Sequence, residues 1–336
     1  MSAAVNESVS LVRLARLSSA TGFVNAVLRR VIREPNYKPA ADVSDPLERI
    51  SIETSHPRWL IERWARAFGF EEAEAFAKAN NIVPPTAFRV VHVRSNEAEV
   101  LSRLSTAGAT VEKSEVAQGA WRVSGATSLV RELSAGGAIY LQDEASQLVA
   151  EMLDVKTGER ALDLCAAPGG KTTVMADRAG DQALIIADDR SATRMATVIA
   201  TTTLHGLRSI QSVILDAAEK LPFESNSFDK VLLDAPCSGT GTLRRNPEIR
   251  WRLSERDIGA FSENQKRFLA NAAEVVKLGG RLVYSTCSVE REENEEVIAE
   301  FLARDDRVEL MTTERTWPQR QGCDGFFIAV FDSRQD

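Results

Sequence analysis

The carboxyl-terminal part of the chain alternates between short apolar runs and helical segments, and this pattern constrains the fold more than any other feature. Strands are expected over residues 161–164, 183–187, 210–215, 231–233, 281–284 and 325–331. Helices are expected between them, over residues 145–153, 172–179, 192–205, 262–276 and 292–303. Strands that alternate with helices are typical of crossover connections between parallel strands. We therefore predict the α/β class, with a doubly wound, mostly parallel sheet.

The residues before this region indicate helices and then a small mixed module. Two helices are expected in residues 5–33, and a linker follows from Glu34 to Pro46. Residues 46–80 are again predicted to be helical. Residues 86–140 change character, because predicted strands at 87–93 and 121–123 surround a predicted helix at 97–104. A small α+β module fits this segment.

Composition is that of a globular protein and argues against a membrane-spanning, secreted or zinc-binding protein. Of the 336 residues, 44% are hydrophobic, and no apolar run reaches the roughly 18–20 residues that span a bilayer. The start of the chain lacks the basic and apolar segments of a secretory signal. The four cysteines lack paired zinc spacing and the three histidines share no spacing, so we expect no metal site. We expect a cytoplasmic monomer with reduced thiols and no membrane association.

The basic residues are clustered, although a net charge of −7 argues against a uniformly basic nucleic-acid binder. Arg244, Arg245 and Arg250 come soon after the predicted strand at 231–233. Such a cluster is typical of a solvated helix face, but beside a candidate active-site loop it also suits RNA phosphates. Trp251 is expected to support this basic loop by packing rather than to stack on a base.

A glycine-rich turn after the strand at 161–164 suits a ligand, because it brings backbone N–H groups and a helix N-terminus together. Its Gly170 and Lys171 resemble a phosphate-binding loop, but that loop needs a glycine where Cys165 stands, which excludes an ATPase. Asp188 ends the next strand, where an acid can bind two ribose hydroxyls. Asp216 follows the third strand and can meet an adenine amino group. An adenosine ligand without phosphates fits these residues, so we predict S-adenosylmethionine.

Two thiols and an acid follow neighbouring predicted strands. Asp234 and Cys237 follow the strand at 231–233, and Cys287 follows the strand at 281–284. A lone cysteine at a strand end is more often a buried hydrophobe, but two thiols beside an acid indicate chemistry. A thiolate can add to carbon 6 of a pyrimidine and thereby make carbon 5 nucleophilic enough to accept a methyl group. The position of Cys237 directly after the acid makes it the first candidate nucleophile.

Three motifs, in this order and spacing, resemble those of the Sun/NOL1/NOP2 family of RNA cytosine-5 methyltransferases. Residues 163–172 read Asp-Leu-Cys-Ala-Ala-Pro-Gly-Gly-Lys-Thr. Residues 234–241 read Asp-Ala-Pro-Cys-Ser-Gly-Thr-Gly, and residues 284–288 read Tyr-Ser-Thr-Cys-Ser. Residues 22–30 and 55–60 are similar to the branch of the family that acts on bacterial 16S rRNA.

The resemblance implies a domain organisation for the whole chain. Residues 141–336 would form a Rossmann-like S-adenosylmethionine-dependent methyltransferase domain, and residues 83–140 a small α+β RNA-binding module. Residues 46–82 would be a helical linker region. Residues 1–45 would be the remnant of a NusB-like helical domain with its linker.

The resemblance also implies roles for single residues and replaces the first candidate nucleophile. It makes Cys287 the nucleophile, Cys237 a group that assists release of the methylated RNA, and Asp234 the acid beside the target base. The implied cofactor-binding residues are Cys165, Ala166, Ala167, Pro168, Gly169, Gly170, Lys171, Asp188, Asp216 and Asp234. The implied product is 5-methylcytosine in small-subunit rRNA.

Alternatives remain open at the level of sequence. DNA cytosine methyltransferases use a Pro-Cys thiol as nucleophile, which would favour Cys237, but their other motifs match this chain less well. A tRNA cytosine-5 methyltransferase would have the same core and another RNA target. A catalytically silent rRNA-binding assembly factor is a third possibility, although intact Cys287, Cys237 and Asp234 argue against it.

Overall fold

The computed structural model describes residues 2–34 and 38–334 and divides into two units, Met1–Glu62 and Arg63–Asp336. The predicted linker after Glu34 lies partly outside the described residues, since residues 35–37 are not among them. Within the described part of the chain, no helix has the length and apolar content needed to cross a membrane.

The first unit is helical. It contains α1 (Ser2–Leu14), a short 3₁₀ turn (Ser18–Ala20), α2 (Thr21–Arg33) and α3 (Pro46–Thr54), and α4 (Arg58–Phe68) begins in it. The two helices predicted for residues 5–33 are confirmed, and α1 and α2 contact each other. Asp45 caps α3 by accepting hydrogen bonds from the backbone N–H groups of Leu47 and Glu48, which fixes where this helix begins.

The second unit begins with a small antiparallel sheet packed on two helices. After α5 (Phe70–Ala79) come β1 (Thr86–Val90), α6 (Glu97–Thr106), β2 (Thr110–Lys113), β3 (Ala120–Ser124), α7 (Thr127–Ala135) and β4 (Ile139–Leu141). The strand order is β2-β3-β1-β4, with antiparallel pairing throughout. Phe88 of β1 is buried with Leu104 of α6 and Leu133 of α7. The predicted α+β character is confirmed, and the sheet has more strands than the sequence indicated.

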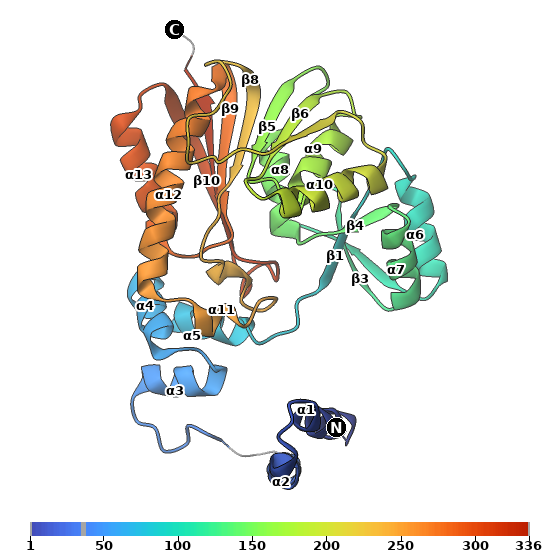
Figure 1. The fold of residues 1–336 in the computed structure, drawn as a ribbon, viewed down its shortest axis with the longest axis vertical. Helices are drawn as coiled ribbons and strands as arrows, with labels where there is room; N and C mark the ends of the chain where they lie inside the picture. Colours follow the sequence, from blue (N-terminus) through green and yellow to red (C-terminus); the bar gives the residue numbers. More distant parts are fainter. Residues whose placement is uncertain (1, 35–37, 335–336) are drawn as a thin grey trace. The chain divides into compact units, whose positions relative to one another are not determined.

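A seven-stranded sheet forms the rest of the second unit (Figure 1). Its elements are α8 (Glu144–Leu153), β5 (Arg160–Leu164), α9 (Gly170–Arg178), β6 (Leu184–Asp188), α10 (Ala192–His205), β7 (Ile210–Val213), β8 (Phe228–Asp234), α11 (Ile249–Arg252), α12 (Glu255–Glu274), β9 (Val276–Thr286), α13 (Glu295–Arg304), β10 (Val308–Thr316) and β11 (Phe326–Ser333). The strand order is β10-β11-β9-β8-β5-β6-β7; the pairs from β9 to β7 are parallel, and β11 runs antiparallel to both of its neighbours, β10 and β9. The predicted doubly wound, mostly parallel sheet is confirmed.

Two local predictions in this sheet are wrong. The long helix was expected to extend to residue 276, but α12 ends at Glu274 and β9 already begins at Val276. The helix also begins earlier than expected, because Ser254 and Asp257 form a reciprocal capping box. Strand β10 was not predicted at all, since it is an edge strand whose residues are mostly exposed and form no apolar run.

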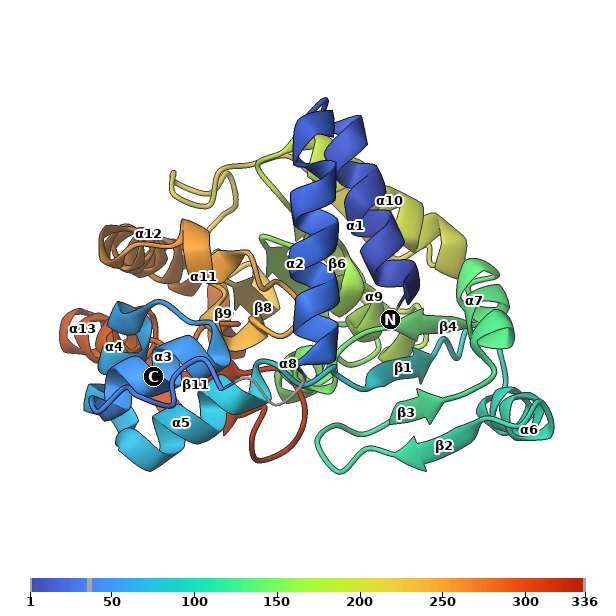
Figure 2. The same ribbon diagram turned by 90° about the horizontal axis from the view of Figure 1, so that it is seen from below.

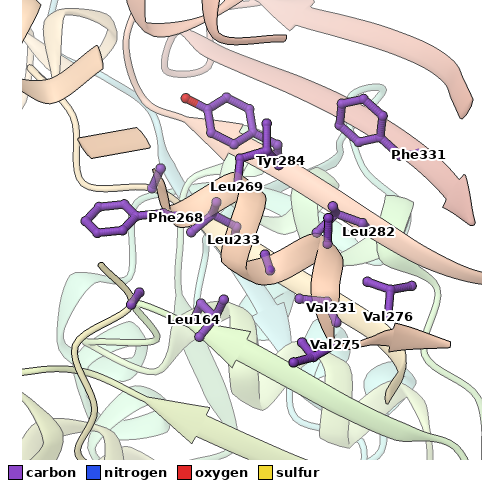
Figure 3. Close-up of a cluster of buried hydrophobic side chains, with 14 of the residues drawn as sticks. Leu164, Val231, Leu233, Phe268, Leu269, Val275, Val276, Leu282, Tyr284 and Phe331 are labelled. Carbon is purple, nitrogen blue, oxygen red and sulfur yellow. The ribbon is translucent and has the colours of Figure 1, made fainter. Parts of the chain in front are cut away.

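Helices cover both faces of the large sheet. On one face, Phe268 and Leu269 of α12 are buried with Val231 and Leu233 of β8 (Figure 3). On the other face, α8 and α9 contribute Val149 and other apolar side chains. Full burial of such a side chain contributes about 1.5–3 kcal/mol, so this packing fixes the central strands firmly. The carboxyl ends of β5, β6, β8 and β9 therefore meet at one rigid edge.

The small sheet is attached to the large domain near α8 and α9 (Figure 2). Asp177 of α9 accepts hydrogen bonds from the backbone N–H groups of His92 (3.0 Å) and Val93 (2.9 Å). Arg122 of β3 donates to Glu144 at the start of α8 over 2.8 Å. Because these carboxylates are buried and their contacts are direct, the module is held in one orientation beside the large sheet.

Candidate active site

Two cysteine sulfur atoms meet at the carboxyl edge of the large sheet. β8 and β9 are adjacent parallel strands, and Asp234 at the end of β8 lies opposite Ser285 of β9. The loops that follow bring the Sγ atoms of Cys237 and Cys287 to 3.4 Å from each other. The hydrogen bond to Cys287 and burial raise the pKa of Cys237 well above its usual value, so this thiol stays protonated. The predicted pairing of the two thiols is thus present in the structure.

A buried carboxylate fixes both cysteine loops. Each cysteine is followed by a serine, and the hydroxyl groups of Ser238 and Ser288 both donate to Glu293. The backbone N–H of Ser238 adds a third hydrogen bond of 2.8 Å, and Gln265 adds a fourth of 3.1 Å. Burial raises the pKa of Glu293, and these hydrogen bonds oppose the shift. We call Glu293, Ser238 and Ser288 the serine clamp.

Sequence reasoning missed the serine clamp. Glu293 lies in a stretch rich in acids, which is typical of a surface segment, yet it is fully buried. The available signal was the repetition of Cys-Ser after two neighbouring strands, since two serines at the same edge need a shared partner when buried.

Two glycines, Gly241 and Gly325, allow the backbone segments around the Cys287 loop to lie very close together. The backbone N–H of Gly241 donates to the carbonyl oxygen of Cys287 over 2.9 Å, and that of Gly325 donates to Gly241 over 2.8 Å. A Cβ atom on Gly241 would lie 1.9 Å from the carbonyl oxygen of Gly325. No side chain fits at position 241, so glycine is required for the loop after β8 to reach the loop after β9.

An open cavity of about 630 Å³ lies at this edge, and one of the two thiols lines it. Cys287 lines it, together with Asp234 and Lys171, whereas Cys237 is not among the described residues that line it. The small sheet contributes Thr86 and Leu141 to the same wall. A ligand in this cavity would meet Cys287 rather than Cys237.

An ion pair between the buried Lys171 and the partly exposed Asp234 lines the same cavity as Cys287. Nζ of Lys171 lies 2.7 Å from Oδ2 of Asp234, and the Ser285 hydroxyl donates to Oδ1 of the same carboxylate over 2.8 Å. Burial opposes the charge of Lys171, but Asp234 outweighs it and raises the pKa of the lysine, which stays protonated. Nζ also lies 5.0 Å from the ring centroid of Phe326, a favourable cation–π contact. The pair offers both a charged donor and a carboxylate to a molecule in the cavity.

The predicted cofactor turn joins β5 to α9 and has the expected strand–turn–helix geometry. Cys165 and Gly169 have positive φ angles of 64° and 100°, so the chain turns sharply at both. A Cβ on Gly169 would lie 3.2 Å from Cα of Val198, and one on Gly170 would lie 3.1 Å from Cε1 of Tyr140. Burial raises the pKa of Cys165, which agrees with a structural rather than a nucleophilic thiol.

The two acids predicted to hold an adenosine line a second cavity. This cavity, of about 140 Å³, is lined by Asp188, Asp216 and Cys165, and Cys165 also lines the larger one. Oδ1 of Asp188 accepts from the backbone N–H of Leu215 over 2.7 Å, while no described residue bonds its buried Oδ2. Burial raises the pKa of Asp188 to about 7. An unpartnered, buried carboxylate oxygen suits a ligand that brings a hydroxyl group.

The three candidate arginines differ in their surroundings. The Arg244 side chain is 3% exposed and donates to Asp324 (2.8 Å) and to the carbonyl of Gly322 (2.9 Å). Arg250 is also buried, in hydrogen bonds to the α5–β1 connection. Arg245 is 33% exposed, lines the large cavity and donates to Asp143 and Asp324. Only Arg245 therefore has a partly exposed guanidinium beside the cavity.

Comparisons with known proteins agree with this site. A family model described as 16S rRNA methyltransferase RsmB/F matches residues 150–332, and a model of the ferredoxin-like domain of RsmF/B-like methyltransferases matches residues 56–129. The probable ribosomal RNA small subunit methyltransferase B of Bacillus subtilis (strain 168) is 34% identical over 352 residues. That match covers 97% of this chain and 77% of the relative.

Solved structures show the same architecture. The crystal structure of PH0851 matches with a TM-score of 0.85 and 32% identity, over 97% of this chain and 75% of that one. The crystal structure of NSun6 from Pyrococcus horikoshii with SFG matches with a TM-score of 0.75 over 83% of this chain and 99% of that one. At 21% identity the second likeness shows the fold alone.

Proposed function

This chain belongs to the RsmB/F family of 16S rRNA methyltransferases, and from that premise we propose that it forms 5-methylcytosine in small-subunit rRNA with S-adenosylmethionine as methyl donor. The observation that carries the proposal is the position of Cys287, which lines one cavity with Asp234 and Lys171. An accessible thiol beside an ion pair suits a nucleophile that must add to a pyrimidine ring.

The residues around the smaller cavity fit the methyl donor. The free Oδ2 of Asp188 would accept a ribose hydroxyl, Asp216 would meet the adenine, and the turn from Cys165 to Lys171 would hold the methionine part. S-adenosylmethionine supplies an electrophilic methyl group. Because Cys165 lines both cavities, a ligand held by Asp188 can reach the cavity that contains Cys287.

Cys287 starts the reaction as the nucleophile. Its thiolate forms a bond to carbon 6 of cytosine, and the electron pair of the 5,6 double bond moves into the ring, which raises the electron density at carbon 5. Asp234 shares a proton with ring nitrogen 3, and the ammonium of Lys171, 2.7 Å from this carboxylate, offsets the negative charge of the adduct.

Cys237 acts at the end of the reaction. After carbon 5 has gained its methyl group and lost its proton to a base, the bond between Cys287 and carbon 6 breaks and the electron pair returns to sulfur. A protonated thiol 3.4 Å away donates a hydrogen bond to that sulfur and makes it a better leaving group. Cys237 thus assists release of the methylated RNA.

The small sheet and Arg245 would bind the RNA. A groove of about 590 Å³ on the small sheet shares Pro84, Pro85, Thr86 and Leu141 with the active-site cavity, so one RNA strand could occupy both. The target base must be unpaired or flipped to reach Cys287. We place the activity in the cytoplasm, where a bacterial ribosome is assembled, and assign it to a monomer.

Methyl transfer to defined RNAs tests the proposal. Purified protein is incubated with labelled S-adenosylmethionine and unmodified 16S rRNA, tRNA or 23S rRNA. Label at carbon 5 of a cytosine in 16S rRNA is the expected result, and transfer to tRNA instead would favour the tRNA enzyme. Absence of transfer to all three, with cofactor binding intact, would contradict an enzyme and favour a silent assembly factor.

A further inference from the structure

Trp251 is exposed, contrary to the expectation that it supports the basic loop by packing. Its side chain is 65% exposed on α11, whereas Trp64 and Trp317 are buried. The segment that leads to α11 lines the active-site cavity with Thr242, Arg245 and Asn246. A large aromatic side chain held in solvent next to a functional cavity is typical of a binding surface.

A second segment that lines the same cavity also places apolar side chains in solvent. Pro84 and Pro85 line it, and the residues just before them, Ile82 and Val83, are 65% and 87% exposed. These two residues belong to the connection between α5 and β1, which is far from α11 in sequence.

Arg250 joins the two segments. Its Nη1 donates to Oδ1 of Asn81 and its Nη2 to the carbonyl oxygen of Asn80, both over 2.8 Å. Figure 1 shows α11 beside the end of α5, where these bonds form. Since Arg250 is 5% exposed and held by direct hydrogen bonds, the neighbouring Trp251 is presented to solvent on a rigid support.

We propose that Trp251, Ile82 and Val83 form a stacking platform that holds the nucleotides flanking the target cytosine. The inference rests on the proposed RNA methyltransferase function and adds the surface that holds the strand outside the cavity. Unpaired bases stack on aromatic and apolar side chains while cations hold the backbone. Arg252 on α11 and Arg245 at the cavity are both exposed, which favours RNA over an apolar protein segment as the occupant.

Two substitutions and a matched control test the platform on the full chain. Trp251→Ala removes the ring, Trp251→Phe keeps an aromatic face, and Leu278→Ala removes an equally exposed apolar side chain (57% exposed) from the part of β9 remote from Cys287. The RNA probes are single strands with one cytosine and increasing numbers of flanking nucleotides. The measurements are KM and kcat for methyl transfer, and quenching of tryptophan fluorescence by acrylamide with and without RNA.

We expect Trp251→Ala to raise KM about tenfold on RNAs with long flanks, because the variant loses a base-stacking contact. Its kcat, its KM on the shortest RNA and the behaviour of Leu278→Ala should be unchanged, and Trp251→Phe should retain most of the affinity. RNA should protect the wild-type protein, but not Trp251→Phe, from quenching.

Equal KM values for Trp251→Ala and the wild type on long RNA would refute the stacking platform but would not contradict the proposed methyltransferase function. An equal loss on short and long RNA would also overturn it, since the ring would then act through the catalytic loops. Failure of the wild type to methylate any RNA would instead refute the proposed function, so the two failures can be told apart.

Discussion

The sulfur atoms of Cys237 and Cys287 lie 3.4 Å apart although the two residues follow different strands of the sheet. Their separation depends on one buried group, because the serine after each cysteine donates to the carboxylate of Glu293. Two features distinguish the thiols: Cys287 lines the open cavity, and the hydrogen bond to Cys287 together with burial raises the pKa of Cys237. This asymmetry is the physical basis for giving them different roles.

Glu293→Gln should slow catalysis without weakening RNA binding. Oε2 of Glu293 accepts from both serine hydroxyls, and Oε1 accepts from the Ser238 N–H and from Gln265. Glutamine keeps only one acceptor oxygen, so one of these two pairs of hydrogen bonds is lost and the cysteine loops are held less firmly. We expect kcat to fall about tenfold or more, as small displacements of reacting groups do, with KM for RNA unchanged. Steady-state kinetics check this, with the exposed Glu296→Gln as control. Equal losses in the two variants would show that Glu293 does not position the thiols.

Lys171→Met should be destabilising, because it leaves Asp234 without its ion-pair partner. Breaking a fully buried pair costs about 3–5 kcal/mol, and the cost here should be smaller because Asp234 is 27% exposed. The double substitution Lys171→Met with Asp234→Leu should cost less than the sum of the single ones. Urea denaturation measures the free energy of unfolding of all three variants. Additive losses would mean that the 2.7 Å contact contributes no coupling.

Cofactor affinity should rise with pH up to about 7 and then level off. Burial raises the pKa of Asp188 to about 7, so the acid is protonated below this pH and ionised above it. The ionised form accepts hydroxyl hydrogen bonds with both oxygens, whereas the protonated form accepts less well. Titration calorimetry with S-adenosylmethionine from pH 5.5 to 8.5, roughly one to two units either side of that pKa, measures how cofactor affinity depends on pH.

Two variants identify the titrating group, because burial also raises the pKa of Asp163 to about 7. Asp188→Asn should bind more weakly and show little pH dependence, while Asp163→Asn should retain the slope. Persistence of the slope in Asp188→Asn would assign it to another acid. The folding stability of the ligand-free protein should change with pH in the opposite direction to cofactor affinity. Because the pKa of Asp188 is raised on folding, its stabilising contribution is fully present below pH 3.8 and is lost as the pH rises through about 7.

The adjacent arginines should separate into a structural and a binding residue. Arg244→Ala should lower the free energy of unfolding by about 3 kcal/mol, since it leaves buried Asp324 without one partner. Arg245→Ala should affect stability less, weaken RNA binding and reduce the salt dependence of binding by about one phosphate contact. Denaturation and salt-dependent binding measure both effects. A larger loss of stability in Arg245→Ala, or a larger loss of RNA binding in Arg244→Ala, would contradict this division of roles.

The core of the fold was predictable because its strands are buried on both faces. Runs such as 231–233 are continuously apolar, and the residues after them carry the chemistry, so Asp234, Cys237 and Cys287 could be placed at one edge from sequence. The edge strand β10 gave no such signal, since most of its side chains face solvent.

The remaining errors arise where tertiary contacts decide the environment of a residue. Glu293 and Arg244 are charged and look like surface residues, yet each is buried by hydrogen-bond partners distant in sequence. Trp251 looks like a core residue, yet Arg250 takes the buried place beside it. Local composition does not show which of two neighbouring residues is buried and which is exposed.

Covalent trapping of RNA tests the assignment of the two thiols most directly. Unmodified 16S rRNA and S-adenosylmethionine are incubated with Cys287→Ala, Cys237→Ala and wild-type protein, and denaturing electrophoresis reveals protein–RNA adducts. The structure predicts no adduct and no product with Cys287→Ala, and an accumulated adduct with Cys237→Ala because its release step fails. Methylation by Cys287→Ala, together with no adduct from Cys237→Ala, would contradict the account and make Cys237 the nucleophile.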